Sequence, residues 1–253
     1  MIPYRDENLT LRTPVVTLAL IAANAFVWIV VQGAGMTMSL ARSVCNLGLI
    51  AGELTGRVLP GTEVPMGEGI QCVTDPGRGV SHLVTSMFLH GSWMHLIGNM
   101  WFLWIFGNDV EDSMGRFRFL FFYVLSGLAA AAAQIAIDPA SVVPMIGASG
   151  AISGVMGAYL VLYPRVRVYT LVPIGFFLTT IALPAWTMLL YWMAIQTISG
   201  LVSLAGASLG GVAFFAHIGG FVAGVVLIRA FKREDLVRAH RAQHWEPRRL
   251  GWR

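Results

Sequence analysis

Residues 147–158 read GASGAISGVMGA, and this stretch constrains how the rest of the chain can fold. It lies inside an apolar segment, residues 145–163, that carries no charged residue. Small residues that recur on one helix face allow two membrane helices to come very close. The segment therefore predicts a membrane helix packed tightly against a neighbour. The glycines that would make this contact are Gly147, Gly150, Gly154 and Gly157.

The composition of the whole chain agrees with a membrane protein. Of its 253 residues, 56% are hydrophobic and 12% are charged, and the mean hydropathy is +0.69. A soluble domain carries about 25% charged residues, so this chain has too few to solvate an ordinary protein surface. The net charge of +4 does not indicate nucleic-acid binding, because eight of the seventeen Lys and Arg residues follow Ile228. We therefore expect a multi-pass protein in a lipid bilayer, with no nucleic-acid partner.

Six apolar segments approach the length of a membrane span, which needs about 20 mostly apolar residues. The second is short, so it either extends backwards through residues 83–89 or lies tilted. A further stretch, residues 168–183, is interrupted by Pro173 and Gly175, and we expect an interfacial or hairpin-like connection there. The predicted spans are residues 15–31, 93–106, 120–137, 145–163, 185–204 and 212–231.

The positions of Lys and Arg predict the orientation in the membrane. With six spans, fourteen of the seventeen basic residues fall on the side of the two termini. The positive-inside rule then places both termini in the cytoplasm. The predicted fold is all-α, a six-helix domain of residues 15–231 in a cell (inner) membrane. A cytoplasmic segment of residues 1–14 precedes it, and a basic cytoplasmic tail of residues 232–253 follows.

The connection of residues 33–81 faces the outside in this orientation. It is long and rich in Gly and Pro, so we expect a structured loop. A Cys45–Cys72 disulfide is chemically permitted there, and two unpaired thiols are an equally good expectation. Two cysteines, with no CxxC or HExxH motif, give no reason to expect a metal or another cofactor.

Four polar residues stand out because the bilayer penalises their side chains. His95 and Asn99 lie in the second predicted span, Ser149 in the fourth and His217 in the sixth. Such residues are rare within spans and usually face a cavity or a partner. These three spans run in one direction, and each residue lies within about the first two turns, so all four share one depth. A common water-accessible site near the outer face explains this best.

Spacing within the spans brings the serine toward a histidine. His217 shares a helix face with Gly220 and Gly224, so the fourth and sixth spans can approach closely. A serine beside a histidine is a nucleophile with its general base. No carboxylate in the predicted spans is placed to complete a triad, so Ser149 and His217 would act as a dyad. Ser153, one turn deeper on the same face, is a competing nucleophile.

The second span would supply donors to this site. His95 and Asn99 are four residues apart, so they stand on one face, and with the Ser149 N–H they could stabilise an oxyanion. Structural explanations compete with this one. A serine in such a helix often bonds to a carbonyl one turn back, an Asn can join helices, and His90 can be an interfacial residue. The shared depth favours a functional site.

Three segments resemble the signature motifs of the rhomboid proteases. His90-Gly-Ser-Trp-Met-His95-Leu-Ile-Gly-Asn99 is similar to their HxxxxHxxxN motif, and Gly147-Ala-Ser149-Gly150 is similar to their GxSG motif. The third, Ala216-His217-Ile-Gly-Gly220-Phe-Val-Ala-Gly224, resembles AHxxGxxxG. The order and the span numbers also agree, and the resemblance covers about residues 13–231.

The resemblance implies an intramembrane serine protease with a six-helix fold. It implies Ser149 as nucleophile, His217 as general base, and His95, Asn99 and the Ser149 amide around the oxyanion. It implies single-pass membrane proteins as substrates, cleaved near the outer end of their spans. The fifth helix and residues 203–211 would gate and cap the site.

Two positions depart from the family pattern. Many members carry Trp-Arg shortly before the first signature histidine, where this chain has Ser81 and His82. Many also place an aromatic residue four after the nucleophile, against the histidine ring, where this chain has Ser153. The resemblance alone therefore does not explain how the loop is anchored or how His217 is oriented.

Two other functions compete with proteolysis. A catalytically inactive relative that binds membrane clients would share the fold and would not need the dyad. A transporter or proton pathway would also use intramembrane His and Asn. It would need polar groups through the full membrane thickness and an inverted repeat, and the inner halves of the predicted spans are apolar.

Overall fold

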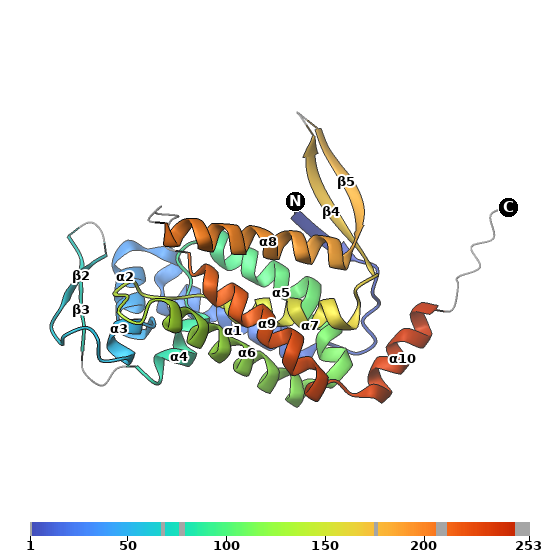
Figure 1. Cartoon of the computed structure of the whole chain (residues 1–253), viewed down its shortest axis with the longest axis horizontal. Helices are drawn as coiled ribbons and strands as arrows, with labels where there is room; N and C mark the ends of the chain where they lie inside the picture. Colours follow the sequence, from blue (N-terminus) through green and yellow to red (C-terminus); the bar gives the residue numbers. More distant parts are fainter. Residues whose placement is uncertain (1, 67–68, 76–78, 175–176, 206–211, 246–253) are drawn as a thin grey trace.

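Long helices form the centre of this computed structural model, which describes residues 2–66, 69–75, 79–174, 177–205 and 212–245. They lie side by side along the length of the molecule (Figure 1). The long helices are α1 (Val15–Phe26, continued by a π-helical turn over Val27–Val31), α5 (Trp93–Met114), α6 (Arg116–Ile137), α7 (Ser149–Leu162), α8 (Ala185–Leu204) and α9 (Phe214–Phe231).

Three of the described helices, α6, α8 and α9, are long and apolar enough to cross a membrane. Their lengths of 22, 20 and 18 residues correspond to about 33, 30 and 27 Å, close to the hydrocarbon thickness of a bilayer. The region Val15–Val31 and α7 are shorter apolar helices. These findings support an integral membrane protein, and the count of six spans stays a prediction.

The second predicted span extends in the direction opposite to the expected one. α5 continues beyond residue 106 to Met114, whereas the preceding apolar stretch forms the short α4 (His82–Thr85) and a 3-10 turn (Ser86–Phe88). The extension contains Asp109, Glu111 and Asp112, which is why hydropathy alone ends the span early.

Partners from the N-terminal region explain why these acidic residues can lie in a buried helix. The carboxylate of Glu111 accepts the N–H groups of Val16 and Thr17 at 3.0 and 2.8 Å and also the Thr17 hydroxyl at 2.8 Å. These N–H groups belong to the first turn of α1, which has no intrahelical acceptor for them. Asp112 accepts the N–H of Leu11 at 2.6 Å. The acidic end of α5 therefore caps α1.

The all-α prediction is wrong in one respect, because the chain also contains strands. β4 (Arg167–Ile174) and β5 (Phe177–Pro184) form an antiparallel hairpin, and β1 (Ile2–Asp6) adds to it in the order β1-β4-β5. The hairpin-like alternative for residues 168–183 is thus confirmed. β-branched residues favour such a strand pair locally. The third strand comes from the far N-terminus, which no local pattern could indicate.

The connection between α1 and α5 folds into small elements at one end of the bundle (Figure 1). The elements are α2 (Thr37–Leu47), α3 (Ala51–Leu54), β2 (Glu63–Pro65), β3 (Gln71–Val73) and α4. A disulfide joins Cys45 of α2 to Cys72 of β3. Leu49 and Met145 exchange both backbone hydrogen bonds, at 3.1 and 2.7 Å, and the Thr85 hydroxyl donates to the Leu47 carbonyl at 2.7 Å. These bonds anchor the loop to α4 and to the segment before α7.

The opposite end of the bundle holds an unexpected buried polar cluster. The predicted tail begins as α10 (Glu234–Trp245), whose buried His240 Nε2 lies 3.5 Å from Asp109 Oδ1. Nearby, the Tyr159 hydroxyl of α7 donates to the Asp6 carboxylate at 2.5 Å. Burial, and then the neighbouring Asp109, raise the pKa of Asp6 to about 9. This cluster ties β1 and α10 to the helices, and Asp109, its residue on α5, lies beyond residue 106, where the second predicted span ends.

The apolar core runs between the long helices, with most of its buried residues on α5, α6 and α7. Its largest side chains include fully buried aromatic rings, and the Phe106 and Tyr159 rings meet edge to face at 4.9 Å. Such pairs add to the stability of close packing between helices. The core fixes the helices on which the polar side chains of the candidate site stand.

Candidate active site

The first turns of two helices bring Ser149 and His217 together. Ser149 is the first residue of α7, and His217 lies in the first turn of α9. The Ser149 Oγ and the His217 Nε2 are 2.8 Å apart, which is hydrogen-bonding distance. Both side chains are half-buried. This is the arrangement of a nucleophile beside a base.

Glycines at the contact between α7 and α9 make this approach possible. A Cβ atom on Gly220 would lie 2.0 Å from the carbonyl oxygen of Gly150, and one on Gly224 would lie 1.9 Å from that of Gly154. No side chain larger than hydrogen fits at either position with the helices at this separation. The two backbones therefore touch, and Ser149 reaches a histidine on the neighbouring helix.

Gly147 allows the chain to pass close to the ring of His95, which belongs to α5. Its φ of +121° is one that L residues rarely adopt, and a Cβ atom there would lie 2.9 Å from the His95 ring. His95 Nδ1 accepts the N–H of Gly91 at 3.3 Å. A neutral imidazole carries one proton, so His95 Nε2 is the donor on the side that faces Gly147.

Asn99 adds a second donor on the same face of α5. Its side chain is 8% exposed, and its Nδ2 has no hydrogen-bond partner among the described residues. A buried donor without a partner is costly, and a ligand oxygen would satisfy it. His95, Asn99, Ser149 and His217 all line one cavity of about 480 Å³. The four residues that the sequence places at one depth thus share one cavity.

Two residues of α8 complete the surroundings of His217, and sequence reasoning missed both. Gln196 Oε1 lies 2.8 Å from His217 Nδ1, and the Trp192 ring centroid lies 5.9 Å from that of His217. Both residues line the cavity. The signal was present, since Gln196 is a polar residue in the fifth predicted span and Trp192 stands one turn before it.

The competing serine has a different environment. Ser153 is 1% exposed, and its hydroxyl donates to the carbonyl oxygen of Ser149 at 2.6 Å. This is the bond to a carbonyl one turn back that is common for serine in a helix. It leaves Ser149 as the serine that faces His217.

The side chain of His90 is buried within the protein. It is 0% exposed, and its ring lies edge to face with that of His95 at 5.1 Å. The side chain of Gln32, at the end of the first predicted span, accepts the His90 N–H and donates to the His90 carbonyl, both at 2.8 Å. His90 therefore supports the position of His95 and does not reach Ser149.

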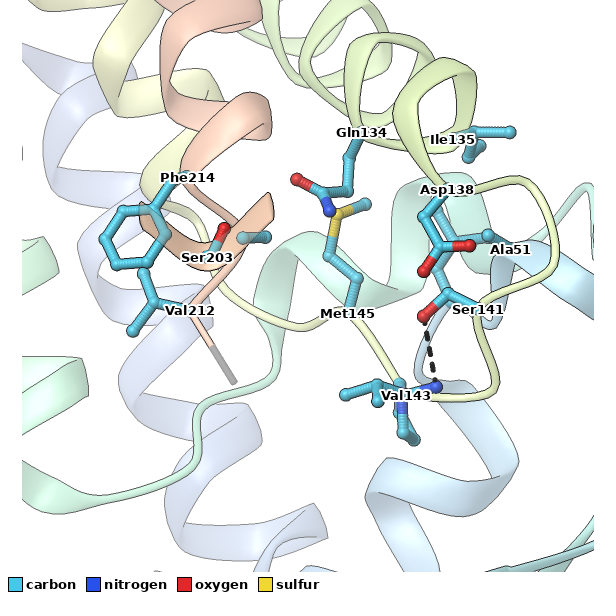
Figure 2. Close-up of a pocket in the computed structure, with 13 residues that line it drawn as sticks. Ala51, Gln134, Ile135, Asp138, Ser141, Val143, Met145, Ser203, Val212 and Phe214 are labelled. Atoms are coloured by element: carbon cyan, nitrogen blue, oxygen red, sulfur yellow. Dashed lines mark hydrogen bonds between the residues drawn. The ribbon is translucent and has the colours of Figure 1, made fainter. Parts of the chain in front are cut away.

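A second cavity, of about 300 Å³, is drawn in Figure 2 and shares lining residues with the first. It lies between the end of α6, the segment of residues 141–145 and the segment before α9. Gln134 of α6 and Asp138, directly after α6, line it, and Met145, Val212 and Ala213 line both cavities. The predicted cap, residues 203–211, lies for the most part outside the described residues.

In the described part of the chain, no group of three or more His, Cys, Asp or Glu residues is arranged to hold a metal ion. Residues 77–234, which contain all three motifs, match the Rhomboid domain family. The chain belongs to the rhomboid family.

Known rhomboids from several sources are similar to this chain. It is 30% identical over 148 residues to Rhomboid-like protein 11, chloroplastic, of Arabidopsis thaliana, which covers 57% of the chain and 50% of that protein. It is 31% identical over 182 residues to Presenilin-associated rhomboid-like protein A, mitochondrial, of Danio rerio, which covers 67% of the chain and 44% of that protein.

A bacterial rhomboid carries a protease name. The chain is 40% identical over 78 residues to Rhomboid protease GluP of Bacillus subtilis, which covers 31% of the chain and 15% of that protein. The chain spans about half the length of the first two relatives. The rhomboids named here come from chloroplasts, mitochondria and a bacterium, so they support an integral membrane protein without indicating which membrane.

Proposed function

We propose that this rhomboid is an intramembrane serine endopeptidase. The observation that carries the proposal is the 2.8 Å separation of Ser149 Oγ and His217 Nε2 inside a cavity that also presents His95 and Asn99. Protease-named relatives support the same reaction class. In this proposal Ser149 is the nucleophile and His217 is the general base.

The first step of the reaction is acylation of the serine. His217 Nε2 takes the Ser149 hydroxyl proton while Oγ forms a bond to the carbonyl carbon of the substrate peptide. The carbonyl π electrons move to its oxygen and form the oxyanion. When the carbon–nitrogen bond breaks, the leaving amine takes the proton from His217. Water then repeats the sequence on the acyl-enzyme and releases the second product.

His95, Asn99 and the Ser149 N–H would stabilise the oxyanion. His95 has its Nδ1 occupied by the Gly91 N–H, which leaves Nε2–H as a donor. The unpartnered Asn99 Nδ2 is the second donor. The Ser149 N–H belongs to the first turn of a helix, where N–H groups lack intrahelical acceptors. Donors fixed before the reaction are worth more than donors that must reorient.

The proposal includes the finer architecture predicted from the sequence. α1, α5, α6, α7, α8 and α9 would be six spans, in a cell membrane, with residues 33–81 on the outside. β1 and α10 lie at one end of the bundle (Figure 1), and the positive-inside rule supports the inner side for that end. Substrates would be single-pass membrane proteins cleaved near the outer end of their spans, with α8 as the gate.

The test is cleavage of a model single-pass substrate, carrying small residues near its outer boundary, by the protein purified in mild detergent. Ser149→Ala and His217→Ala are each expected to lower the rate about 10⁴-fold or more. Ser153→Ala, the matched serine control, is expected to keep cleavage. Parent-like cleavage by Ser149→Ala would refute the assignment. No cleavage by the folded parent, over several substrates, would favour a client-binding relative.

A further inference from the structure

Both ring nitrogens of His217 have partners, and the two partners lie on different helices. Nε2 faces the Ser149 hydroxyl of α7 at 2.8 Å, and Nδ1 faces Gln196 Oε1 of α8 at 2.8 Å. An amide oxygen can only accept a hydrogen bond. With the Gln196 amide in this orientation, Nδ1 would carry the proton of the neutral His217 ring, and Nε2 would offer its lone pair to the serine.

This choice of tautomer matters for the reaction. A base that carried its proton on Nε2 would point a hydrogen at the Ser149 oxygen and could not take the serine proton. In serine proteases with a triad, a carboxylate on Nδ1 enforces the productive tautomer. No carboxylate lines the cavity in the described residues, so the Gln196 amide oxygen occupies that position here.

Trp192 restricts the plane of the same ring. The centroid of the Trp192 ring lies 5.9 Å from that of the His217 ring, and the two planes are tilted by 38°. It lies 6.4 Å from the centroid of the Phe221 ring, with a tilt of 33° between the planes. The position four after the nucleophile, Ser153, instead turns its hydroxyl back to Ser149 O. The aromatic ring against His217 thus comes from Trp192 of α8 and not from position 153 of α7, the helix that carries the nucleophile.

We infer that Gln196 is a positioning residue that holds His217 in the tautomer able to accept the Ser149 proton, and that Trp192 fixes the ring plane. The inference rests on the proposed protease function and extends it to α8. It has a structural consequence. The base is aligned only while α8 packs against α9, because both positioning side chains come from α8.

The first measurement needs no variant at position 196. The protein is labelled with ¹⁵N-histidine, and the His217 ring nitrogens are identified by comparison with His217→Ala. The expected result is a protonated Nδ1 and an unprotonated Nε2 in the neutral ring. A proton on Nε2 would overturn the inference whatever the variants do.

The second measurement is the rate at which a fluorophosphonate labels the serine, which reports nucleophilicity without a peptide substrate. Gln196→Met keeps the length of the side chain and removes the acceptor, and we expect labelling to fall about 10- to 100-fold. Gln196→Glu keeps an acceptor and should restore labelling to within a few-fold of the parent. The matched control is Thr197→Val on the same helix, since the Thr197 hydroxyl donates to Met193 O within α8.

The outcomes separate this inference from the proposed function. Labelling of Ser149→Ala at the parent rate would show that Ser149 is not the nucleophile. It would refute both the proposed function and the positioning role of Gln196. Ser149-dependent labelling that is unchanged in folded Gln196→Met would overturn the positioning role alone. Loss of labelling in Gln196→Met, rescue by Gln196→Glu and a parent-like Thr197→Val would support it. Thermal unfolding of each variant identifies losses that come from misfolding.

Discussion

Replacing Gly224 with Ala tests whether backbone contact between α7 and α9 sets both stability and the dyad. The added methyl group would lie 1.9 Å from the carbonyl oxygen of Gly154. An ordinary carbon–oxygen contact needs about 3.3 Å, so the helices would have to move apart by about 1.4 Å. The obstacle is backbone, so no change of side-chain rotamer relieves it.

Two effects follow from this displacement. Overpacking at a helix contact costs about 1–3 kcal/mol of unfolding free energy. His217 stands two turns before Gly224 on the same face, so separation of the helices lengthens its 2.8 Å contact with Ser149. A displacement of about 1 Å at a reacting group costs about 100-fold in rate, which corresponds to about 2.7 kcal/mol. We therefore expect losses of stability and of activity that are similar in free energy.

The assay combines chemical unfolding in detergent with the rate of fluorophosphonate labelling of the folded fraction. Gly98→Ala is the stability control, because a Cβ atom there meets nothing within 4 Å and the glycine lies within α5. It should be neutral or more stable by up to about 1 kcal/mol. If Gly224→Ala unfolds and reacts like the parent, the two backbones are not in contact and the reasoning is wrong.

Three further predictions concern the rest of the fold. Glu111→Ala leaves donors at the start of α1 without an acceptor, so we expect chemical unfolding to show a loss of about 3 kcal/mol in unfolding free energy. Replacing the exposed Glu63 with Ala is the control and should change the unfolding free energy very little. An equal loss in both variants would contradict the capping role. The pKa of Asp6 is raised from 3.8 to about 9, so its stabilising effect is complete below the unfolded value and is lost as the pH rises toward about 9. Asp6→Asn should flatten this decline in thermal unfolding between about pH 5 and about pH 9, and a parallel decline in both proteins would exclude Asp6 as its source. Replacing both Cys45 and Cys72 with Ser removes a link across 27 residues and should lower the unfolding free energy by up to about 3.5 kcal/mol; an unchanged unfolding midpoint would show that the link contributes nothing.

Local sequence patterns predict most of the helices. The fifth span is predicted at the observed bounds of α8, Ala185–Leu204, because turn-forming residues bound its apolar run on both sides. The second span is predicted too short, because hydropathy treats Glu111 and Asp112 as solvent-exposed. Their partners come from residues about 100 positions away along the chain. A window on the sequence cannot detect such a partner.

Some features of the candidate site also follow from local sequence patterns. Depth along a helix follows from residue number and rise, so the sequence places His95, Asn99, Ser149 and His217 at one level without a structure. The face that a residue shares with its helical neighbours also follows from spacing. The glycines of two helices indicate that these helices approach. These inferences consider one helix at a time, or only whether two helices can approach closely.

The sequence by itself therefore determined the membrane environment, the helices and the residues that share a depth. The tertiary structure decided which side chains meet. Gln196 and Trp192 reach His217 because α8 packs beside α9 with the face that carries them turned toward it, and β1 pairs with β4 although the two strands lie far apart in the sequence. Periodicity defines the faces of each helix, but the rotation and position of one helix against another depend on packing across the whole bundle.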